Sequence, residues 1–201
     1  MTPTHYHTVS LTPTDNYATD TRLWIGSANT CSGLHSDLKD NIFVQISGRK
    51  KVYLVPFKQT NLVYPFIDNV VNSMVDPDNV DISRYPNFLK ATVYETTVNH
   101  GEMLFIPKGW WHYLKSESKS ISVNHWFGKP ISSIHYLYLI ARLGHKHIFR
   151  MFGDMLRYSI LDRKYRKDFF FTPVSNGERF YNLIRYGNFS QSLFKFFSIA
   201  N

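Results

Sequence analysis

Short apolar runs alternate with polar turns along the first two thirds of this chain. The runs are rich in β-branched and aromatic side chains, and Gly, Asn, Ser and Lys separate them. This pattern predicts eight β-strands. Their expected ranges are Leu23–Ser27, Cys31–Ser36, Asn41–Ile46, Lys50–Pro56, Ala91–Val98, Glu102–Pro107, Trp111–Glu117 and Ser120–Phe127.

A different pattern follows Lys129-Pro130. Ile131–Leu143 and His145–Tyr158 place apolar residues three and four positions apart, which is typical of amphipathic helices. A further helix is expected over Gly177–Tyr186. Strands followed by helices predict a mainly β fold, an antiparallel barrel or sandwich, with a helical appendage at the C-terminal end.

An insert separates the fourth and fifth runs. Phe57–Lys90 contains Pro65, Pro77 and Pro86 together with several Asp and Asn residues. Prolines at this density do not suit a central strand. We expect the insert to lie outside the barrel and to cover one edge of a sheet.

The net charge changes at the same place along the chain as the hydrophobic pattern. Residues 1–127 hold 11 Lys and Arg against 11 Asp and Glu, whereas residues 128–201 hold 12 against 4, so the whole net charge of +8 lies in the second part. We predict an irregular lead-in over residues 1–22, a barrel over residues 23–127 and a basic helical region over residues 128–201.

Two features of the sequence indicate the cellular compartment. Cys31 is the one cysteine in the sequence, so no internal disulfide can form and a reducing compartment is expected. No N-terminal segment combines a basic region with an apolar core, so the sequence predicts neither a signal peptide nor a membrane anchor. The cytoplasm or the nucleus is the expected location.

The stretch GLHSDLKDN contains a candidate metal site. Side chains alternate across a strand, so His35 and Asp37 point the same way while Ser36 points the opposite way. His112, at the start of a late strand, is the candidate for a third ligand. Two His and one carboxylate with open positions form the facial triad of non-haem Fe(II) oxygenases. A single His-x-Asp pair also arises often by chance.

Lys50 stands just before the apolar run VYLVP. Burying an ammonium is costly unless it meets an anion, and the carboxylate of a cosubstrate would be such a partner. The alternative is that Lys50 lies on the rim of the barrel with its neighbours Arg49 and Lys51.

Several motifs in series resemble one family. SGLHSDLKDNIFVQISGRKKVYLVP, RYPNF, VYETTVNHGEMLFIPKGWWHYLKS and ISVNHWF are together similar to the JmjC domain. The similar branch is cupin-like and includes the asparaginyl hydroxylase that acts on hypoxia-inducible factor and the tRNA wybutosine hydroxylase. The resemblance covers about Leu23 to Phe127, and 34 residues precede His35, fewer than relatives usually carry.

The resemblance implies a double-stranded β-helix of the cupin or jelly-roll type that binds Fe(II) and 2-oxoglutarate. His35, Asp37 and His112 match the iron ligands of the family. Four further positions match residues around the cosubstrate. Lys50 and Ser32 match residues that bind the distal carboxylate of 2-oxoglutarate, and Asn41 and Asn124 match amides that line the pocket.

The implied activity is that of a dioxygenase that hydroxylates a protein side chain. The same chemistry on a modified tRNA or on methylated lysine remains an alternative. A non-catalytic cupin-type binding module is a further alternative from a different class. A zinc-dependent cupin isomerase is a weaker one, because it would not need Lys50 or the paired Asn41 and Asn124.

The basic C-terminal region has three interpretations. The aromatic segment HYLYLIARLGHKHIFRMF suits burial in a homodimer built from these helices. RYSILDRKYRKDFFF mixes basic and aromatic residues, as nucleic-acid surfaces do, and would favour an RNA partner. A solvated helix face is the third. A protein or peptide substrate is the principal partner expected, without a membrane.

Overall fold

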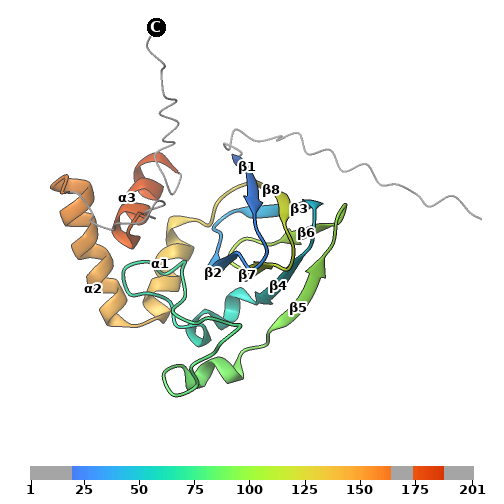
Figure 1. Cartoon of the computed structure of the whole chain (residues 1–201). Helices are drawn as coiled ribbons and strands as arrows, with labels where there is room; N and C mark the ends of the chain where they lie inside the picture. The colour runs from blue at the N-terminus through green and yellow to red at the C-terminus, as the bar shows by residue number, and fades with distance from the viewer. Residues whose placement is uncertain (1–19, 164–173, 188–201) are drawn as a thin grey trace, which may run out of the picture.

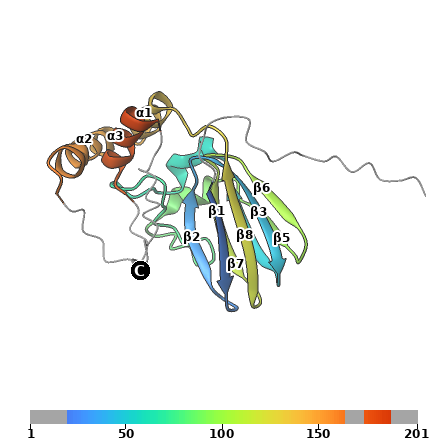
Figure 2. The same ribbon diagram turned by 90° about the horizontal axis from the view of Figure 1, so that it is seen from above.

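Two stacked antiparallel sheets form one side of the molecule and the C-terminal helices the other in the computed structural model, which describes residues 20–163 and 174–187 (Figures 1 and 2). One sheet has the strand order β1-β8-β3-β6 and the other β2-β7-β4-β5. The eight strands of the described residues are β1 (Asp20–Gly26), β2 (Cys31–Ser36), β3 (Asp40–Ser47), β4 (Lys50–Val55), β5 (Tyr94–Val98), β6 (Met103–Ile106), β7 (Trp111–Ser116) and β8 (Ser120–Phe127). This interleaved order is the predicted double-stranded β-helix. The expected strands are all present, with ends shifted by up to three residues.

The barrel interior follows from side-chain alternation. Asn41, Phe43 and Gln45 of β3 are fully buried, as are Ser122 and, nearly, Asn124 of the neighbouring β8. Apolar side chains fill the middle of the barrel, and polar ones gather toward both ends. The apolar core consists of Phe43, Val52, Val98 and Ile106, with Leu54, Leu104, Trp110 and Leu114 packed against it.

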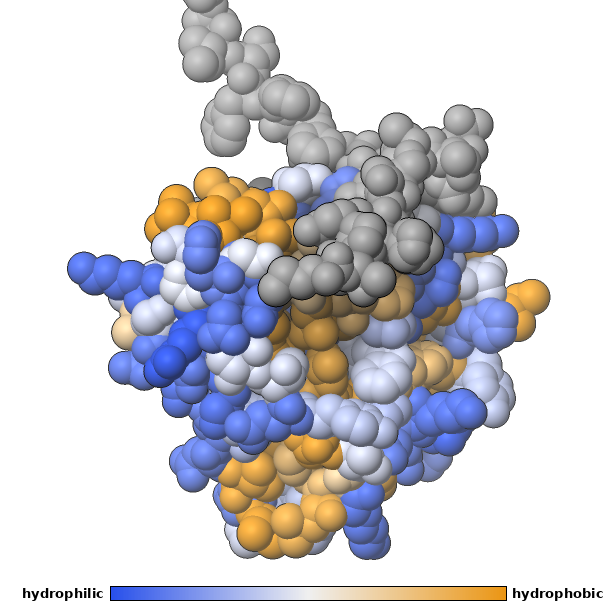
Figure 3. Space-filling model, turned by 90° about the vertical axis from the view of Figure 1, so that its right-hand side faces the viewer, coloured by the Kyte–Doolittle hydropathy of each residue, from blue (hydrophilic) through white to orange (hydrophobic). Residues whose placement is uncertain are grey.

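The outer face of the β1-β8-β3-β6 sheet is apolar as well. One cross-strand row joins Leu23, Val123, Val44 and Met103, and Leu23 and Met103 are 61% and 69% exposed. Figure 3 shows apolar surface at the top of the molecule, where this sheet lies. The sheet therefore has apolar side chains on both faces, whereas the solvent side of an antiparallel sheet is usually polar.

The insert packs on the other sheet. It contains two short helices, η1 (Phe57–Leu62) and η2 (Pro86–Lys90). It covers the outer face of β2, β7 and β4 rather than a sheet edge, because these strands point apolar side chains outward. The shared core unites Leu34, Val55, Trp111 and Tyr113 of the strands with Val63, Val75 and Phe88 of the insert.

Trp111 is the largest fully buried side chain of this layer, and its indole Nε1 donates a 3.0 Å hydrogen bond to Thr60 Oγ1 of the insert. Trp111→Ala is expected to lower the free energy of unfolding by about 3–5 kcal/mol, because it leaves a cavity and removes the hydrogen bond to Thr60. Urea unfolding measures this. Phe149→Ala is the control, since Phe149 is 74% exposed. An equal loss in the two variants would contradict the prediction.

The helices after the barrel are α1 (Ser133–Arg142), α2 (His145–Asp154), the π-helical η3 (Met155–Ile160) that continues it, and α3 (Asn176–Tyr186). α3 begins at a capping box of Ser175 and Glu178 and ends at Gly187, which has a φ of 67°. Asn176 connects this helix to the rest, because its Oδ1 accepts from Val70 N and from Tyr136 Oη.

Parts of two predicted regions lie outside the described residues. These parts are residues 1–19 of the lead-in and residues 164–173 and 188–201 of the basic region, including most of RKYRKDFFF. Within the described part of the chain, each helix is too short or too polar to span a bilayer.

Candidate metal centre

A bulge in β2 aims two of the predicted site residues into the barrel. Ser32 pairs with Leu114 of β7 and His35 pairs with His112, so the register shifts by one residue between them. Cross-strand partners share a face of the sheet. Ser32 and His35 therefore face the same side although they are three positions apart, which regular alternation would not allow.

The structure brings His35, Asp37 and His112 together. The rings of the two histidines are 4.2 Å apart, and Asp37 Oδ2 lies 3.3 Å from His112 Nε2. One potential ligand atom from each residue lies within 4.8 Å of the others, and no other group of this kind occurs among the described residues. Asp37 directly follows β2, and Gly109 N donates to its backbone carbonyl at 2.6 Å.

Backbone carbonyls set the tautomers of both histidines. His35 Nδ1 lies 2.7 Å from Gly33 O, and His112 Nδ1 lies 3.1 Å from Trp110 O. A carbonyl only accepts hydrogen bonds, so each neutral ring carries its proton on Nδ1 and presents a lone pair at Nε2. At His112 that lone pair faces the Asp37 carboxylate, and two acceptors this close need a proton or a cation between them.

The electrostatics favour the metal-binding protonation states. Burial and the neighbouring His112 lower the pKa of His35 to about 4. Burial alone would raise the pKa of Asp37, but its interactions with the neighbouring His112 and the hydrogen bond from Trp126 outweigh burial and hold that pKa below its usual range. At neutral pH His35 is therefore uncharged and Asp37 ionised, and metals bind these forms.

The metal-free protein is expected to lose stability as the pH falls from about 6.5 to about 4. His35 has a lowered pKa in the fold, so the unfolded chain binds a proton there in this window while the folded chain does not. The loss amounts to at most about 3 kcal/mol. Urea unfolding at several pH values measures it, with His35→Asn as the comparison. An equally steep loss in that variant would rule out His35 as the source.

Lys50, the first residue of β4, points to the opposite sheet. Its Nζ donates to Ser122 Oγ of β8 at 2.8 Å and lies 5.5 Å from the centre of the Phe43 ring. Burial lowers the pKa of this ammonium. Among the described residues, no carboxylate forms an ion pair with it. Lys50 is thus a partly desolvated cation without an anionic partner in the chain, rather than a rim residue like Arg49.

The remaining predicted residues line the same interior. Asn124 Nδ2 donates to Asn41 Oδ1 at 3.1 Å, and Asn41 Nδ2 donates to Asp37 Oδ2 at 3.1 Å. Ser32 Oγ accepts from Leu114 N at 3.2 Å. All seven predicted site residues thus lie on inward-facing positions of β2, β3, β4, β7 and β8 or directly after β2.

Sequence reasoning missed two contributors. Ser122 contacts Lys50, and Gly109 holds the backbone of Asp37. The alternation of Ser120, Ser122 and Asn124 along β8 was the available signal, because a run of polar residues on the buried face of a strand indicates a lined pocket rather than a core. No local pattern points to Gly109.

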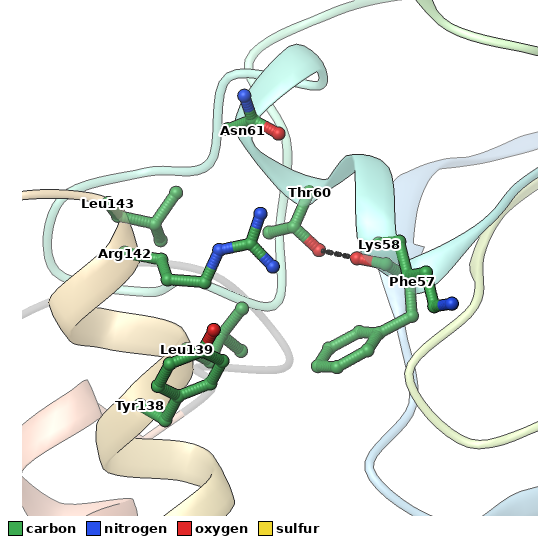
Figure 4. Close-up of a pocket in the computed structure, with 8 residues that line it drawn as sticks. All are labelled: Phe57, Lys58, Thr60, Asn61, Tyr138, Leu139, Arg142 and Leu143. Carbon is green, nitrogen blue, oxygen red and sulfur yellow. Dashed lines mark hydrogen bonds between the residues drawn. The ribbon is translucent and has the colours of Figure 1, made fainter.

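A separate concavity lies between η1 and α1 (Figure 4). Arg142 of α1 extends toward Thr60 and Phe57 of η1 across it. Half of the eight residues that line it are aliphatic or aromatic and half are polar or charged, and none of the predicted site residues is among them. This concavity is therefore distinct from the metal centre.

Comparison with known proteins places these residues in a family. Residues 6–133 match the family described as a cupin-like domain. Lysine-specific demethylase JMJ30 of Arabidopsis thaliana is 35% identical over 112 residues, 55% of this chain and 26% of that protein. Lysine-specific demethylase 8 of Xenopus tropicalis is 37% identical over 106 residues, 52% and 24%.

Human HSPB1-associated protein 1 is 34% identical over 113 residues, 53% of this chain and 23% of that protein. The matched part thus spans about a quarter of the length of these curated relatives. Among solved structures, a cupin superfamily protein of Desulfitobacterium hafniense aligns with 54% of this chain and 66% of its own, at 6% identity and a TM-score of 0.33.

Proposed function

We propose, because this chain belongs to the cupin-like domain family, that it is an Fe(II)- and 2-oxoglutarate-dependent dioxygenase. The observation that supports this most is the donor set. Two imidazole lone pairs and one ionised carboxylate converge inside the barrel, and the contact between His112 Nε2 and Asp37 Oδ2 needs a cation or a proton. Nitrogen and oxygen donors from three side chains, with the rest of the coordination sphere open, suit a non-haem Fe(II) ion.

The residues proposed to bind the metal ion and those proposed to bind the cosubstrate lie at two ends of the pocket. His35, Asp37 and His112 would hold the metal ion, and Lys50 would bind the distal carboxylate of 2-oxoglutarate. Together, bound Fe(II) and 2-oxoglutarate supply the activation of dioxygen for hydroxylation of a C–H bond, with release of succinate and carbon dioxide. The protein contributes orientation and a pocket with little water.

The small polar groups of the interior orient the cosubstrate in this proposal. Ser32 and Ser122 both offer hydroxyls to the interior, where Ser32 Oγ accepts from Leu114 N and Ser122 Oγ accepts from Lys50 itself. Asn41 and Asn124 line the wall between this end and the metal ligands. Phe43 of the apolar core lies next to the Lys50 ammonium, so this end of the interior is partly apolar.

The proposed substrate is a protein side chain, which the enzyme hydroxylates. Demethylation of methylated lysine is a second candidate, which the names of two relatives favour. Both reactions share one step, because hydroxylation of an N-methyl group is followed by loss of formaldehyde. Identification of the product distinguishes them, since demethylation releases formaldehyde and stable hydroxylation adds one oxygen atom to the substrate.

The test is succinate formation by the purified protein with Fe(II), ascorbate, 2-oxoglutarate and a broad panel of peptides, including methylated ones. We expect succinate that requires both Fe(II) and 2-oxoglutarate and that stops on addition of a chelator. Glutarate has both carboxylates but no keto group, so it should compete with 2-oxoglutarate without being converted. Absence of metal-dependent succinate across the panel would favour a non-catalytic binding module instead.

A further inference from the structure

Two N–H donors converge on one oxygen of the proposed metal ligand Asp37. Trp126 of β8 donates from its indole Nε1 to Asp37 Oδ2 at 2.7 Å, and Asn41 of β3 donates from Nδ2 to the same atom at 3.1 Å. The indole bond is the shorter of the two, and it joins a neutral donor to an ionised acceptor, which strengthens a hydrogen bond. Asp37 stands after the end of β2, where the ladder of that strand no longer restrains it.

The Trp126 side chain is restrained through its backbone and through one face of its ring. Its strand pairs with β1 and β3, so its backbone lies inside the sheet, opposite Asp20 and Asn41. The Arg22 guanidinium lies over the ring, 5.3 Å from its centre, and Arg22 forms an ion pair with Asp20 at 2.6 Å. The indole N–H is thus presented to Asp37 by an anchored side chain.

The hydrogen bond from Trp126 fixes the orientation of the Asp37 carboxylate. A carboxylate rotates about two side-chain bonds, and an N–H donor on one oxygen selects one rotation. The selected orientation places the carboxylate beside Nε2 of His112 rather than toward solvent. Partners of this kind that orient the ligands of a metal typically change its affinity 10- to 100-fold when they are removed.

We propose that Trp126 is a positioning residue of the metal centre, whose indole N–H fixes the carboxylate of Asp37 for binding of a divalent ion; this rests on the metal site of the proposed function. Trp126 acts through Asp37 and does not itself contact the ion. Asn41 assists from the other side, held in turn by Asn124. The role needs the N–H group and not the ring alone.

The test is a titration of the purified 201-residue chain with Co(II) alone, followed by the visible absorption of the bound ion. Trp126→Phe keeps a ring under Arg22 and removes the N–H donor. We expect its Co(II) affinity to fall about 10- to 100-fold and the absorption bands to shift, since a less restrained carboxylate changes the ligand geometry. Trp24→Phe makes the same chemical change on β1 and should leave both measurements at the wild-type values.

Urea unfolding of the metal-free proteins separates positioning from general damage. Under the proposal, Trp126→Phe has metal-free stability comparable to Trp24→Phe and yet binds Co(II) more weakly. Wild-type affinity and an unchanged spectrum in Trp126→Phe would overturn this inference and leave the proposed function standing. Failure of the wild-type protein itself to bind Co(II) would overturn both.

Discussion

His112→Ala is expected to reduce 2-oxoglutarate-dependent succinate formation to the background rate. The substitution removes one of the three proposed metal ligands and leaves His35 and Asp37, which lie two positions apart in the same segment. It also removes the ring that lies 4.2 Å from that of His35, so His35 loses one of its packing contacts. The assay is succinate release at saturating Fe(II) and 2-oxoglutarate.

His125→Ala is the matched control for this experiment. His125 belongs to β8, which follows β7 in the sequence but lies in the other sheet. Its side chain is on the outer face of that sheet, where Nδ1 contacts Thr21 Oγ1 at 2.7 Å. Its replacement removes an imidazole of the same size without altering the ligand set, so most of the activity should remain. Activity in His112→Ala similar to that in His125→Ala would show that His112 is not a ligand.

Lys50→Met is expected to raise the KM for 2-oxoglutarate by roughly 100-fold or more, which corresponds to about 3 kcal/mol. Methionine keeps the length and the packing over Phe43 but removes the charge. The distal carboxylate of the cosubstrate would then be desolvated without a cation. Initial rates of succinate formation over a range of 2-oxoglutarate concentrations measure the effect.

Lys51→Met provides the comparison, because Lys51 is the next residue of β4 and points to the outer face. There it contacts Tyr53 Oη at 2.9 Å and Glu95 at 3.5 Å. We expect its KM for 2-oxoglutarate to equal that of the wild type. An unchanged KM in Lys50→Met would refute an anion-binding role for Lys50, while a loss of kcat alone would indicate a different role in the pocket.

The fold was largely predictable because strand signals are local. Alternating apolar positions and turn residues located all eight strands, and two of them, Cys31–Ser36 and Ser120–Phe127, have the expected ends. The largest shift at a later strand concerns β5, which begins at Tyr94 rather than at Ala91. The preceding residues form η2, and its last hydrogen bond, from Ala91 N to Phe88 O, delays the strand.

The contacts between distant segments were not predictable from local patterns. The insert was expected at a sheet edge, whereas Val63 and Phe88 pack on the outward face of β2 and β7. The amide of Asn176 bonds to Val70 and Tyr136, but nothing near Asn176 in the sequence indicates those partners.

The candidate site likewise has a part that the sequence predicts and a part that it does not. A motif that matches a family predicts which residues gather, as with His35, Asp37 and His112. It does not predict the hydrogen bonds that orient them, because these depend on the bulge in β2 and on the register between β8 and β3. The hydrogen bond from Trp126 to Asp37 is visible in the structure but has no signal in the sequence.

The pairing of His35 with His112 has a consequence for folding. β2 comes early in the barrel and β7 late, so β3, β4, the insert, β5 and β6 lie between the two histidines in the sequence. An unfolded chain does not present the three donors together, and an ion would therefore bind the native state alone. Such an ion would act as a crosslink between an early and a late strand of the barrel, and raising its concentration would raise the melting temperature through mass action.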